Sequence, residues 1–598
     1  MAKKYIDVMD TTFRDGFQSV FGGRVLMEDF FPAVEAAKDA GINHFEFGGG
    51  ARFQSLFFYL QENAFEMMDR FREIVGPEAN LQTLSRGINT VMLDTGSREM
   101  IDLHAKLFKK HGTTTIRNFD ALNDVNNLAY SAECIKRHGL QHEAVITMMD
   151  LPPGCKGAHD VAFYEKTLRN MLDAGIEFDS LCFKDASGTA NPNKVYETIS
   201  MARKLLGEEV HLRLHTHETA GVSVASYLAA LEAGANGIDM AASPVSGGTS
   251  QPDILTMLHA VKGTNYNLGD LELNKVLKYE ERLKECLEEY MIPPEATQVS
   301  PLIPFSPMPG GALTANTQMM RDDNSLDKFD EVIAEMKEVV ERGGYGTSVT
   351  PVSQFYWQQA YANVMFGKWK QIAPGYGRMV LGYFGKTPVE ADPEIIKLAS
   401  EKLKLEPTTE NPLDLADKEV SKSIAYWKKV LEDEELEATE ENIFIAAACD
   451  QKGIAFLKGE SPLMVRKGKN NTDCGGENMS GSYTVVVDGK SYSVQVAEGD
   501  AEIQVTPSSA PAAAAAPSAA PAASGGKGSL EIKSQTPGNV WKILKAPGDS
   551  VAEGEQIMIL EAMKMEIDIV AERAGVIKSI EVNTNDAVVD GQLLATME

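Results

Sequence analysis

The chain has 598 residues, a formal net charge of −29 and a sequence pI near 4.9, and 43% of its residues are hydrophobic. This length is more than one hydrophobic core serves, so several folding units are expected. The acidic balance argues against binding of nucleic acid or an anionic membrane surface through a general basic field.

Residues 1–280 alternate short apolar runs with longer amphipathic stretches such as 27–41 and 191–207. The N-terminus enters this pattern at once, so no signal peptide is expected. Eight alternations of strand and helix predict an α/β fold, a (β/α)8 TIM barrel, over an open doubly wound sheet. The predicted strands begin at Tyr5, His44, Leu81, Thr115, Ala144, Asp179, His211 and Gly237.

Three polar segments follow predicted strands: DTTFRDGFQS from Asp10, FKDASG from Phe183 and HTHETAG from His215. Barrel enzymes place their chemistry at these C-terminal strand ends. His215 and His217 are two residues apart, so on a strand they point the same way and can bind one ion. By itself the pair is also consistent with hydrogen-bonded core histidines, Asp15 with a helix cap, and Lys184 with a buried ion pair.

The second half of the chain divides into four parts. Residues 281–440 are predicted to form a helical extension, and 441–505 a small association region containing a hairpin around Asp488-Gly489. Residues 506–528 form an Ala/Pro linker, because such a composition buries too little apolar surface to fold. Residues 529–598 form a separate domain. The six cysteines include no CxxC pair, and no run approaches the ~18 apolar residues of a membrane span, which is typical of a cytoplasmic protein without a direct membrane span.

The last domain contains an internal repeat: GDSVAEGEQIMILE from Gly548 recurs as NDAVVDGQLLATME from Asn585. Two similar halves predict a small pseudo-symmetric all-β domain. Lys564 lies between them in EAMKMEI, flanked by Met563 and Met565. This segment resembles biotin carboxyl carrier domains, in which the lysine of A-M-K-M is biotinylated, more than lipoyl domains, which usually have D-K-A. The resemblance implies covalent biotin on Lys564, attached by a biotin protein ligase.

Together, the barrel motifs and the carrier resemble the carboxyltransferase of pyruvate carboxylase and of oxaloacetate decarboxylase over nearly the whole chain. The resemblance implies a divalent ion, usually zinc with manganese or cobalt as alternatives. Its ligands are Asp15, His215, His217 and a carbamylated Lys184. A carbamate makes chemical sense of the lysine, because an ammonium group cannot ligate a cation.

The same resemblance assigns the substrate contacts. Arg14, Arg86 and Gln18 match the residues that hold the substrate carboxylate, a role that suits a planar guanidinium. Thr350, in SVTPVSQ, matches the proton shuttle between biotin and the substrate methyl group, and Ser353 is a biotin contact. The implied reaction transfers the carboxyl group of carboxybiotin to the enolate of pyruvate and gives oxaloacetate; in reverse it decarboxylates oxaloacetate.

The barrel mouth departs from the family pattern. Phe17 stands where R-D-A-H-Q-S has a histidine, and Gly48 where W-G-G-A-T-F-D has a tryptophan. In the same segment Arg52 replaces a threonine and Gln54 an aspartate, while Leu93 occupies the position of a pocket tyrosine. The reaction type is retained, but the 2-oxo acid and the seating of biotin are left open.

Several alternatives remain at this point. Arg14, Asp15 and Glu46 also have counterparts in condensing aldolases of the isopropylmalate-synthase type, but those enzymes lack K-D-A-S-G and a fused carrier. A non-enzymatic biotin carrier with a degenerate barrel is disfavoured by the retained metal and arginine motifs.

The partner of the chain is open as well. Since no ATP-grasp motif is present, a separate ATP-dependent biotin carboxylase is expected, as for the B subunit of a two-subunit pyruvate carboxylase. The alternative is the α subunit of a sodium-pumping oxaloacetate decarboxylase docked on membrane β and γ subunits, peripheral to the inner membrane face. Gln354 and the linker resemble the decarboxylase branch, whereas the altered barrel mouth favours the carboxylase. A homo-oligomer is expected from the resemblance.

Overall fold

The computed structural model describes residues 3–269, 271–322, 324–468 and 530–598, the last range without 535, 537, 563, 564, 585 and 590. It also describes the backbone of two strands, β11 (Gly481–Val487) and β12 (Lys490–Val496). The predicted linker 506–528, the Asp488-Gly489 turn and Lys564 therefore lie outside the described residues.

Eight parallel strands close into a barrel in sequence order, β2 to β9, which confirms the predicted fold. The last strand pairs with the first, with Asp7 opposite Gly237 and Asp10 opposite Met240. The strands are β2 (Asp7–Asp10), β3 (His44–Gly49), β4 (Asn80–Ser85), β5 (Thr115–Asn118), β6 (Gln141–Thr147), β7 (Ser180–Asp185), β8 (His211–Thr216) and β9 (Gly237–Met240).

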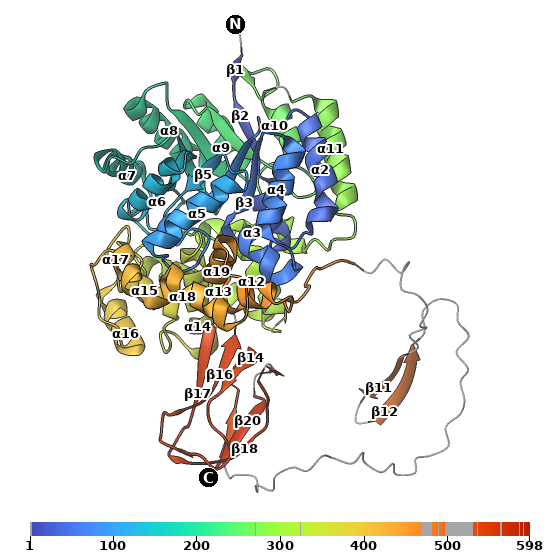
Figure 1. Ribbon diagram of the computed structural model, residues 1–598, viewed down its shortest axis with the longest axis vertical. Coiled ribbons are helices and arrows are strands. Elements are labelled where there is room, and N and C mark those ends of the chain that lie inside the picture. The colour runs from blue at the N-terminus through green and yellow to red at the C-terminus, as the bar shows by residue number, and fades with distance from the viewer. Residues whose placement is uncertain are drawn as a thin grey trace.

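Amphipathic helices cover the outside of the barrel (Figure 1). Helix α8 illustrates how the sequence sets them: the Asn191 side chain accepts from the Lys194 amide, Pro192 opens the helix, and Gly207 ends it at φ 75°. Its buried face includes Val195 and Ile199. The helices are α2 (Met27–Asp39), α4 (Ala64–Val75), α5 (Arg98–Lys110), α6 (Asn126–Arg137), α7 (Val161–Asp173), α8 (Pro192–Leu206), α9 (Ser223–Glu232), α10 (Ile254–Ala260) and α11 (Leu273–Cys286).

Charged side chains fill the middle of the barrel. Arg117 Nε lies 2.5 Å from Glu143, and its NH1 group lies 2.5 Å from Asp239. Arg213 lies 3.0 Å from Asp239 and 3.3 Å from Glu143, and also pairs with Asp7. Apart from the partly accessible Asp7 side chain, these groups are at most 2% exposed, so each charge depends on its neighbours for compensation. This network forms a rigid base beneath the C-terminal mouth.

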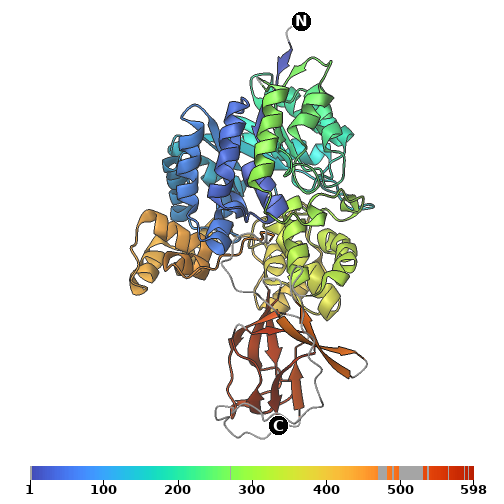
Figure 2. The same cartoon turned by 90° about the vertical axis from the view of Figure 1, so that its right-hand side faces the viewer.

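A second apolar core lies over that mouth. It combines barrel residues such as Leu84 and Phe119 with helical residues such as Trp357 and Tyr376. Figures 1 and 2 place these helices at the end of the barrel opposite the N-terminus. They are α12 (Gly310–Asp322), α13 (Phe329–Arg342), α14 (Val352–Phe366), α15 (Pro374–Val380) and α16 (Pro393–Leu403).

The next helices return to the barrel wall. They are α17 (Pro412–Lys418), α18 (Ile424–Asp433) and α19 (Glu440–Leu457). Phe444 of α19 lies 5.8 Å from Phe53 and 6.3 Å from Phe108, between ring centroids. Helix α19 is kinked at Asp450, whose backbone has φ 50° and ψ −139°. After it, β11 and β12 pair as the predicted antiparallel hairpin.

The C-terminal domain consists of two four-stranded sheets, in the orders β13-β20-β18-β15 and β17-β16-β14-β19. Each sequence repeat supplies one short and one long strand, and the two strands of a repeat enter different sheets. This exchange produces the predicted pseudo-symmetry. The strands are β13 (Leu530–Lys533), β14 (Gly538–Ile543), β15 (Ser550–Val551), β16 (Gln556–Ala562), β17 (Met565–Val570), β18 (Gly575–Ile580), β19 (Ala587–Val588) and β20 (Leu593–Met597).

The C-terminal domain lies next to the helical region in both views (Figures 1 and 2). Phe366, the last residue of α14, packs against the domain's apolar core. No helix in the described part of the chain is long and apolar enough to cross a membrane.

Candidate active site at the barrel mouth

Strand ends bring the predicted metal ligands together. Asp15 lies in a short helical turn, η1 (Thr12–Gly16), that directly follows β2. Lys184 is the penultimate residue of β7, and His215 and His217 come from the end of β8 and the residue after it. All four side chains are buried, at 4% exposure or less. Segments distant in sequence thus meet at the end of the barrel where barrel enzymes act.

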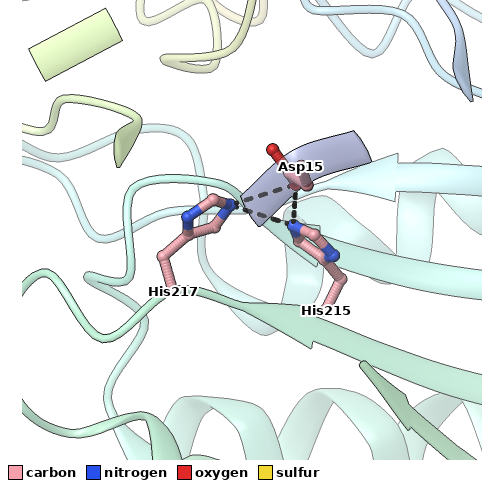
Figure 3. Close-up of side chains that lie close together, drawn as sticks. All are labelled: Asp15, His215 and His217. Carbon is pink, nitrogen blue, oxygen red and sulfur yellow. Dashed lines mark hydrogen bonds and ion pairs between the residues drawn. The ribbon is translucent and has the colours of Figure 1, made fainter. Parts of the chain in front are cut away.

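Asp15, His215 and His217 form a compact triangle, drawn in Figure 3. The two Nε2 atoms lie 3.1 Å apart, and Asp15 Oδ2 lies 3.2 Å from His215 Nε2 and 3.4 Å from His217 Nε2. Ligands at ~2.05 Å from a tetrahedral zinc ion would lie about 3.3 Å apart. The distances between the three ligand atoms are therefore those expected around a single first-row divalent ion.

Both imidazoles are oriented by their Nδ1 atoms. His215 Nδ1 lies 2.8 Å from Asp239 Oδ2, and His217 Nδ1 lies 2.7 Å from the Thr249 carbonyl oxygen. Burial and the neighbouring Lys184 lower the pKa of His215, which favours the neutral imidazole that a metal requires. Each ring thus donates from Nδ1 and directs Nε2 into the cluster.

Lys184 completes the cluster on its fourth side. Its Nζ atom lies 2.7 Å from His215 Nε2 and 3.6 Å from Asp15 Oδ2. Burial lowers the pKa of this lysine, so the neutral amine that reacts with CO2 is more accessible than at the surface. Burial alone would raise the pKa of Asp15, but Arg14 and Lys184 hold it well below its usual value. The donor set is anionic and buried, which fits a divalent cation.

Sequence reasoning missed three contributors to this cluster. Asp239 and Thr249 orient the histidines, and the Gln251 amide nitrogen lies 3.1 Å from Asp15 Oδ2 and 3.0 Å from His217 Nε2. The one available signal was the carboxylate of Asp239 inside the apolar run GIDMAAS, which marks a side chain needing a buried partner. Nothing local distinguishes Thr249 or Gln251.

The two predicted substrate arginines are buried at 1% and 3% exposure. Arg14 NH2 lies 2.6 Å from Glu46 and 3.0 Å from Asp15, while its NH1 group faces Gln18 at 3.4 Å. Arg86 NH1 donates to the carbonyl oxygens of Val91 at 2.7 Å and Met92 at 3.1 Å. Backbone and carboxylate contacts thus fix both guanidinium planes.

A small pocket beside the cluster has a cavity volume of about 40 Å³. At about 10–15 Å³ per water, that space accepts a molecule of a few water volumes. Its polar lining brings the predicted substrate contacts into one place; its apolar lining includes Leu84, Phe119, Ala186 and Val349. The polar lining residues are Arg14, Asp15, Gln18, Arg86, Lys184, His217 and Thr350.

A larger groove of about 830 Å³ adjoins this pocket and shares Gln18, Arg86 and Thr350 with it. Ser353 lines only the groove, and His215 lines neither cavity. The groove wall also includes residues of α18 and α19, and Trp541 of the C-terminal domain. The groove therefore connects the small pocket with the C-terminal domain.

Known proteins resemble the chain over this whole arrangement. Family models match residues 117–271 (HMGL-like), 303–496 (Conserved carboxylase domain) and 531–597 (Biotin-requiring enzyme). The B subunit of pyruvate carboxylase from Methanocaldococcus jannaschii is 31% identical, over 94% of each chain. The chain belongs to the biotin-dependent carboxyltransferase family. This membership sets aside the condensing-aldolase alternative and the non-enzymatic carrier.

Other family members differ in their named substrates. The methylmalonyl-CoA carboxyltransferase 5S subunit of Propionibacterium freudenreichii is 31% identical over 70% of this chain and 81% of its own. The 2-oxoglutarate carboxylase large subunit of Hydrogenobacter thermophilus is 28% identical, covering 95% and 91%. The carboxyl transferase domain of Rhizobium etli pyruvate carboxylase has the same fold, with a TM-score of 0.69 at 22% identity over 83% of this chain and 89% of that one.

The departures from the carboxyltransferase pattern have structural roles here. Arg52 is fully buried and donates to the carbonyl oxygens of Gly23 and of Val25, the latter at 2.8 Å. Gln54 donates to the Ala448 carbonyl oxygen of α19 at 2.7 Å. Phe17 packs edge-on against Phe30, with ring centroids 5.3 Å apart. Of these three residues Gln54 lines the groove, so its hydrogen bond ties the groove wall to α19.

Proposed function

We propose that this carboxyltransferase moves a carboxyl group between carboxybiotin on its own Lys564 and pyruvate, giving oxaloacetate. One observation carries the proposal: Thr350 lines both the small pocket beside the Asp15–His215–His217 cluster and the groove next to the carrier domain. A residue at that junction can contact both an acceptor in the pocket and a biotin in the groove.

The cluster supports binding of one divalent ion, with zinc expected and manganese or cobalt as alternatives. Asp15, His215, His217 and a carbamylated Lys184 would hold it, since their spacing fits and all are buried. Such an ion supplies Lewis-acid polarisation of a 2-oxo group and stabilises the charge that develops on its oxygen.

The arginines suit the carboxylate of a 2-oxo acid. Arg86 faces the pocket with its guanidinium held by two carbonyl oxygens, and burial with the charge of Arg14 lowers its pKa only to about 9, so it stays cationic at neutral pH. Gln18 adds a neutral donor beside Arg14. Arg14 is positioned to stabilise the enolate oxygen that forms when the methyl group loses a proton.

The size of the pocket favours pyruvate over longer 2-oxo acids. A 2-oxoglutarate molecule would carry a second carboxylate toward walls that include Leu84, Phe119 and Val349. Burying a carboxylate there without a partner would cost roughly several kcal/mol. Arg14, Arg86 and Lys184 are the cationic side chains among the described residues that line the pocket, and none is left for a second carboxylate.

Thr350 would carry the proton in the transfer. The bond between the biotin nitrogen and the carboxyl group breaks and releases CO2. The Thr350 hydroxyl then gives its proton to that nitrogen and receives the methyl proton of pyruvate. The resulting enolate carbon forms a bond to CO2, so atoms and charge balance. Ser353, one helical turn further, lies within the groove as a biotin contact.

The two remaining possibilities differ in the partner protein that exchanges the carboxyl group with the carrier. The chain covers 94% of two proteins named as the B subunit of pyruvate carboxylase, from Methanocaldococcus jannaschii and Methanothermobacter thermautotrophicus. Their names favour a separate ATP-dependent biotin carboxylase as partner. A cytoplasmic homo-oligomer is part of the same proposal and follows from the family resemblance alone. The alternative is the α subunit of a sodium-pumping decarboxylase on membrane β and γ subunits, for which Gln354 and the Ala/Pro linker are the sequence indications.

Reconstitution tests the proposal. The biotinylated chain mixed with the cognate biotin carboxylase, ATP, bicarbonate and pyruvate should form oxaloacetate, detected by coupling to malate dehydrogenase. A Lys564→Arg chain is the control for dependence on the carrier. Failure of this mixture, together with sodium-dependent oxaloacetate decarboxylation in membranes that hold β and γ subunits, would establish the alternative.

A further inference from the structure

The first turn of α14 places two buried polar groups without partners in the groove. Ser353 is 2% exposed, and its hydroxyl has no hydrogen-bond partner among the described residues. The amide nitrogen of the adjacent Gln354 is likewise buried and without a partner in that part of the chain. Leaving such groups unsatisfied costs about 1–3 kcal/mol each, so both point to a ligand that satisfies them.

Several other polar groups on the groove wall already have partners, whereas the Thr95 hydroxyl and the Arg86 Nε atom lack one among the described residues. The Gln54 amide donates to the Ala448 carbonyl oxygen, and Lys422 lies 3.0 Å from Asp94. Lys452 Nζ lies over the Phe58 ring, 5.1 Å from its centroid. Ser353 and Gln354 are the unpartnered groups that lie closest in sequence to Thr350, where the transferred group must arrive.

The chemistry of a carboxamide indicates the ligand group. A glutamine offers one donor and one acceptor side by side, and a cyclic urea offers a carbonyl acceptor beside an N–H donor. A hydroxyl one residue away supplies another contact to the same planar group.

We propose that Gln354, next to the biotin contact Ser353, binds the ureido ring of biotin through its carboxamide and sets the orientation of that ring toward Thr350. Gln354 is thus a specificity-determining residue of the biotin site. The inference rests on the proposed function for its ligand, but it concerns binding and is testable without turnover.

Binding of biocytin, the biotinyl-lysine that mimics the loaded carrier arm, tests the proposal directly. Calorimetry on a Lys564→Arg chain measures Kd without competition from tethered biotin. Gln354→Met removes both hydrogen bonds at similar volume, and Gln354→Glu removes the donor alone. Gln451→Met is the matched control, because Gln451 also lines the groove but its side chain is exposed to solvent.

We expect Gln354→Met to weaken biocytin binding roughly ten-fold, the loss of about 1.4 kcal/mol, with Gln354→Glu at least as weak and Gln451→Met unchanged. The proposal would be overturned if the Kd values of the Gln354 variants lay within roughly two-fold of that of the parent chain. It would also be overturned if the parent chain did not bind biocytin. Biocytin binding that depends on Gln354 without any biotin-dependent decarboxylation of oxaloacetate would instead refute the proposed function alone.

A separate observation concerns how the carrier domain reaches the groove. Trp541 is 48% exposed on β14 and lines the groove together with Tyr426 and Trp427 of α18. At the other end of α14, Phe366 packs against the carrier's core. Large aromatic side chains are the residues that most often dominate docking energy.

We infer that Trp541 and Phe366 are the docking contacts that hold the carrier domain at the carboxyltransferase groove. Trp541→Ala should slow oxaloacetate decarboxylation through tethered biotin about ten-fold and leave the reaction with free biotin unchanged. Val589→Ala is the control, since Val589 is also exposed, at 56%, but outside the groove. Equal rates for the two variants on tethered biotin, with biotinylation confirmed by mass, would refute the inference.

Discussion

The carboxylate of Asp239 is the best place to test how the barrel interior supports the metal cluster. Its Oδ2 atom lies 2.8 Å from His215 Nδ1 and 2.5 Å from Arg117, and its Oδ1 atom lies 3.0 Å from Arg213. Arg117 and Arg213 hold the pKa of Asp239 well below its usual value although burial alone would raise it. Asp239→Asn keeps the shape but removes the charge that orients His215.

Two costs follow from these contacts. Arg117 would keep Glu143 and, at 3.9 Å, Glu46 as acidic partners, and Arg213 would keep Glu143 and Asp7. Weakening a buried ion network in this way costs about 3–5 kcal/mol of folding free energy. Losing the carboxylate behind a metal-binding histidine lowers metal affinity about 10- to 100-fold, or about 1.4–2.7 kcal/mol.

The control separates these two effects. Glu143→Gln disturbs the same arginines, since Glu143 lies 2.5 Å from Arg117 and 3.3 Å from Arg213, but Glu143 has no contact with His215 among those the structure describes. Urea unfolding should show similar destabilisation for both variants, whereas competition with a chromogenic chelator should show weaker metal binding for Asp239→Asn alone. Equal metal affinities in the two variants would refute the assigned role of Asp239.

Three further results are expected. Lys184→Ala should abolish carboxyl transfer and leave the carrier biotinylated, as mass spectrometry can check; full activity would remove the carbamate ligand from the proposal. Pyruvate should exceed 2-oxoglutarate as acceptor by about 100-fold or more in kcat/KM, because the small pocket offers no partner to a second carboxylate; comparable values would contradict the pocket assignment. Burial lowers the pKa of His142 and His159 to about 4, below the usual 6.5. Between these values the unfolded chain binds protons that the folded chain does not, so the folding free energy of the neutral imidazoles is fully present above pH 6.5 and is lost as the pH falls toward 4. Urea unfolding at pH 7 and pH 5 should differ by about 2 kcal/mol per histidine, and His159→Gln should remove its share; an unchanged difference in that variant would contradict this assignment.

Much of the architecture was predictable from the sequence because it depends on local patterns. The alternation of apolar runs and amphipathic helices indicated the eight-stranded barrel, and the repeat beginning at Gly548 indicated the two-sheet carrier. The ligand triangle was also within reach, since strand ends in a barrel converge and the HxH spacing places His215 and His217 on one side.

Other features depended on contacts between distant segments. Asp239 lies 24 residues after His215, and its role depends on the pairing of neighbouring strands around the barrel. Gln54 lies 394 residues from Ala448 in the sequence. The replacement of the family's aspartate by Gln54 could therefore not be recognised from the sequence as a hydrogen bond to α19. The domain boundaries at 280, 440, 505 and 528 remain predictions. Helix α19 begins at Glu440 but packs on the barrel, so 440 is not marked by a separation in space. The linker between 505 and 528 lies outside the described residues.

Isotope exchange tests the central claim without any partner protein. The fully biotinylated chain, incubated with oxaloacetate and carbon-labelled pyruvate, should move label into oxaloacetate, because carboxyl transfer to biotin and back interconverts the two acids. A Lys564→Arg chain should show none. Absence of exchange in a preparation that is metal-loaded and biotinylated, or equal exchange in the Lys564→Arg chain, would contradict the proposed function.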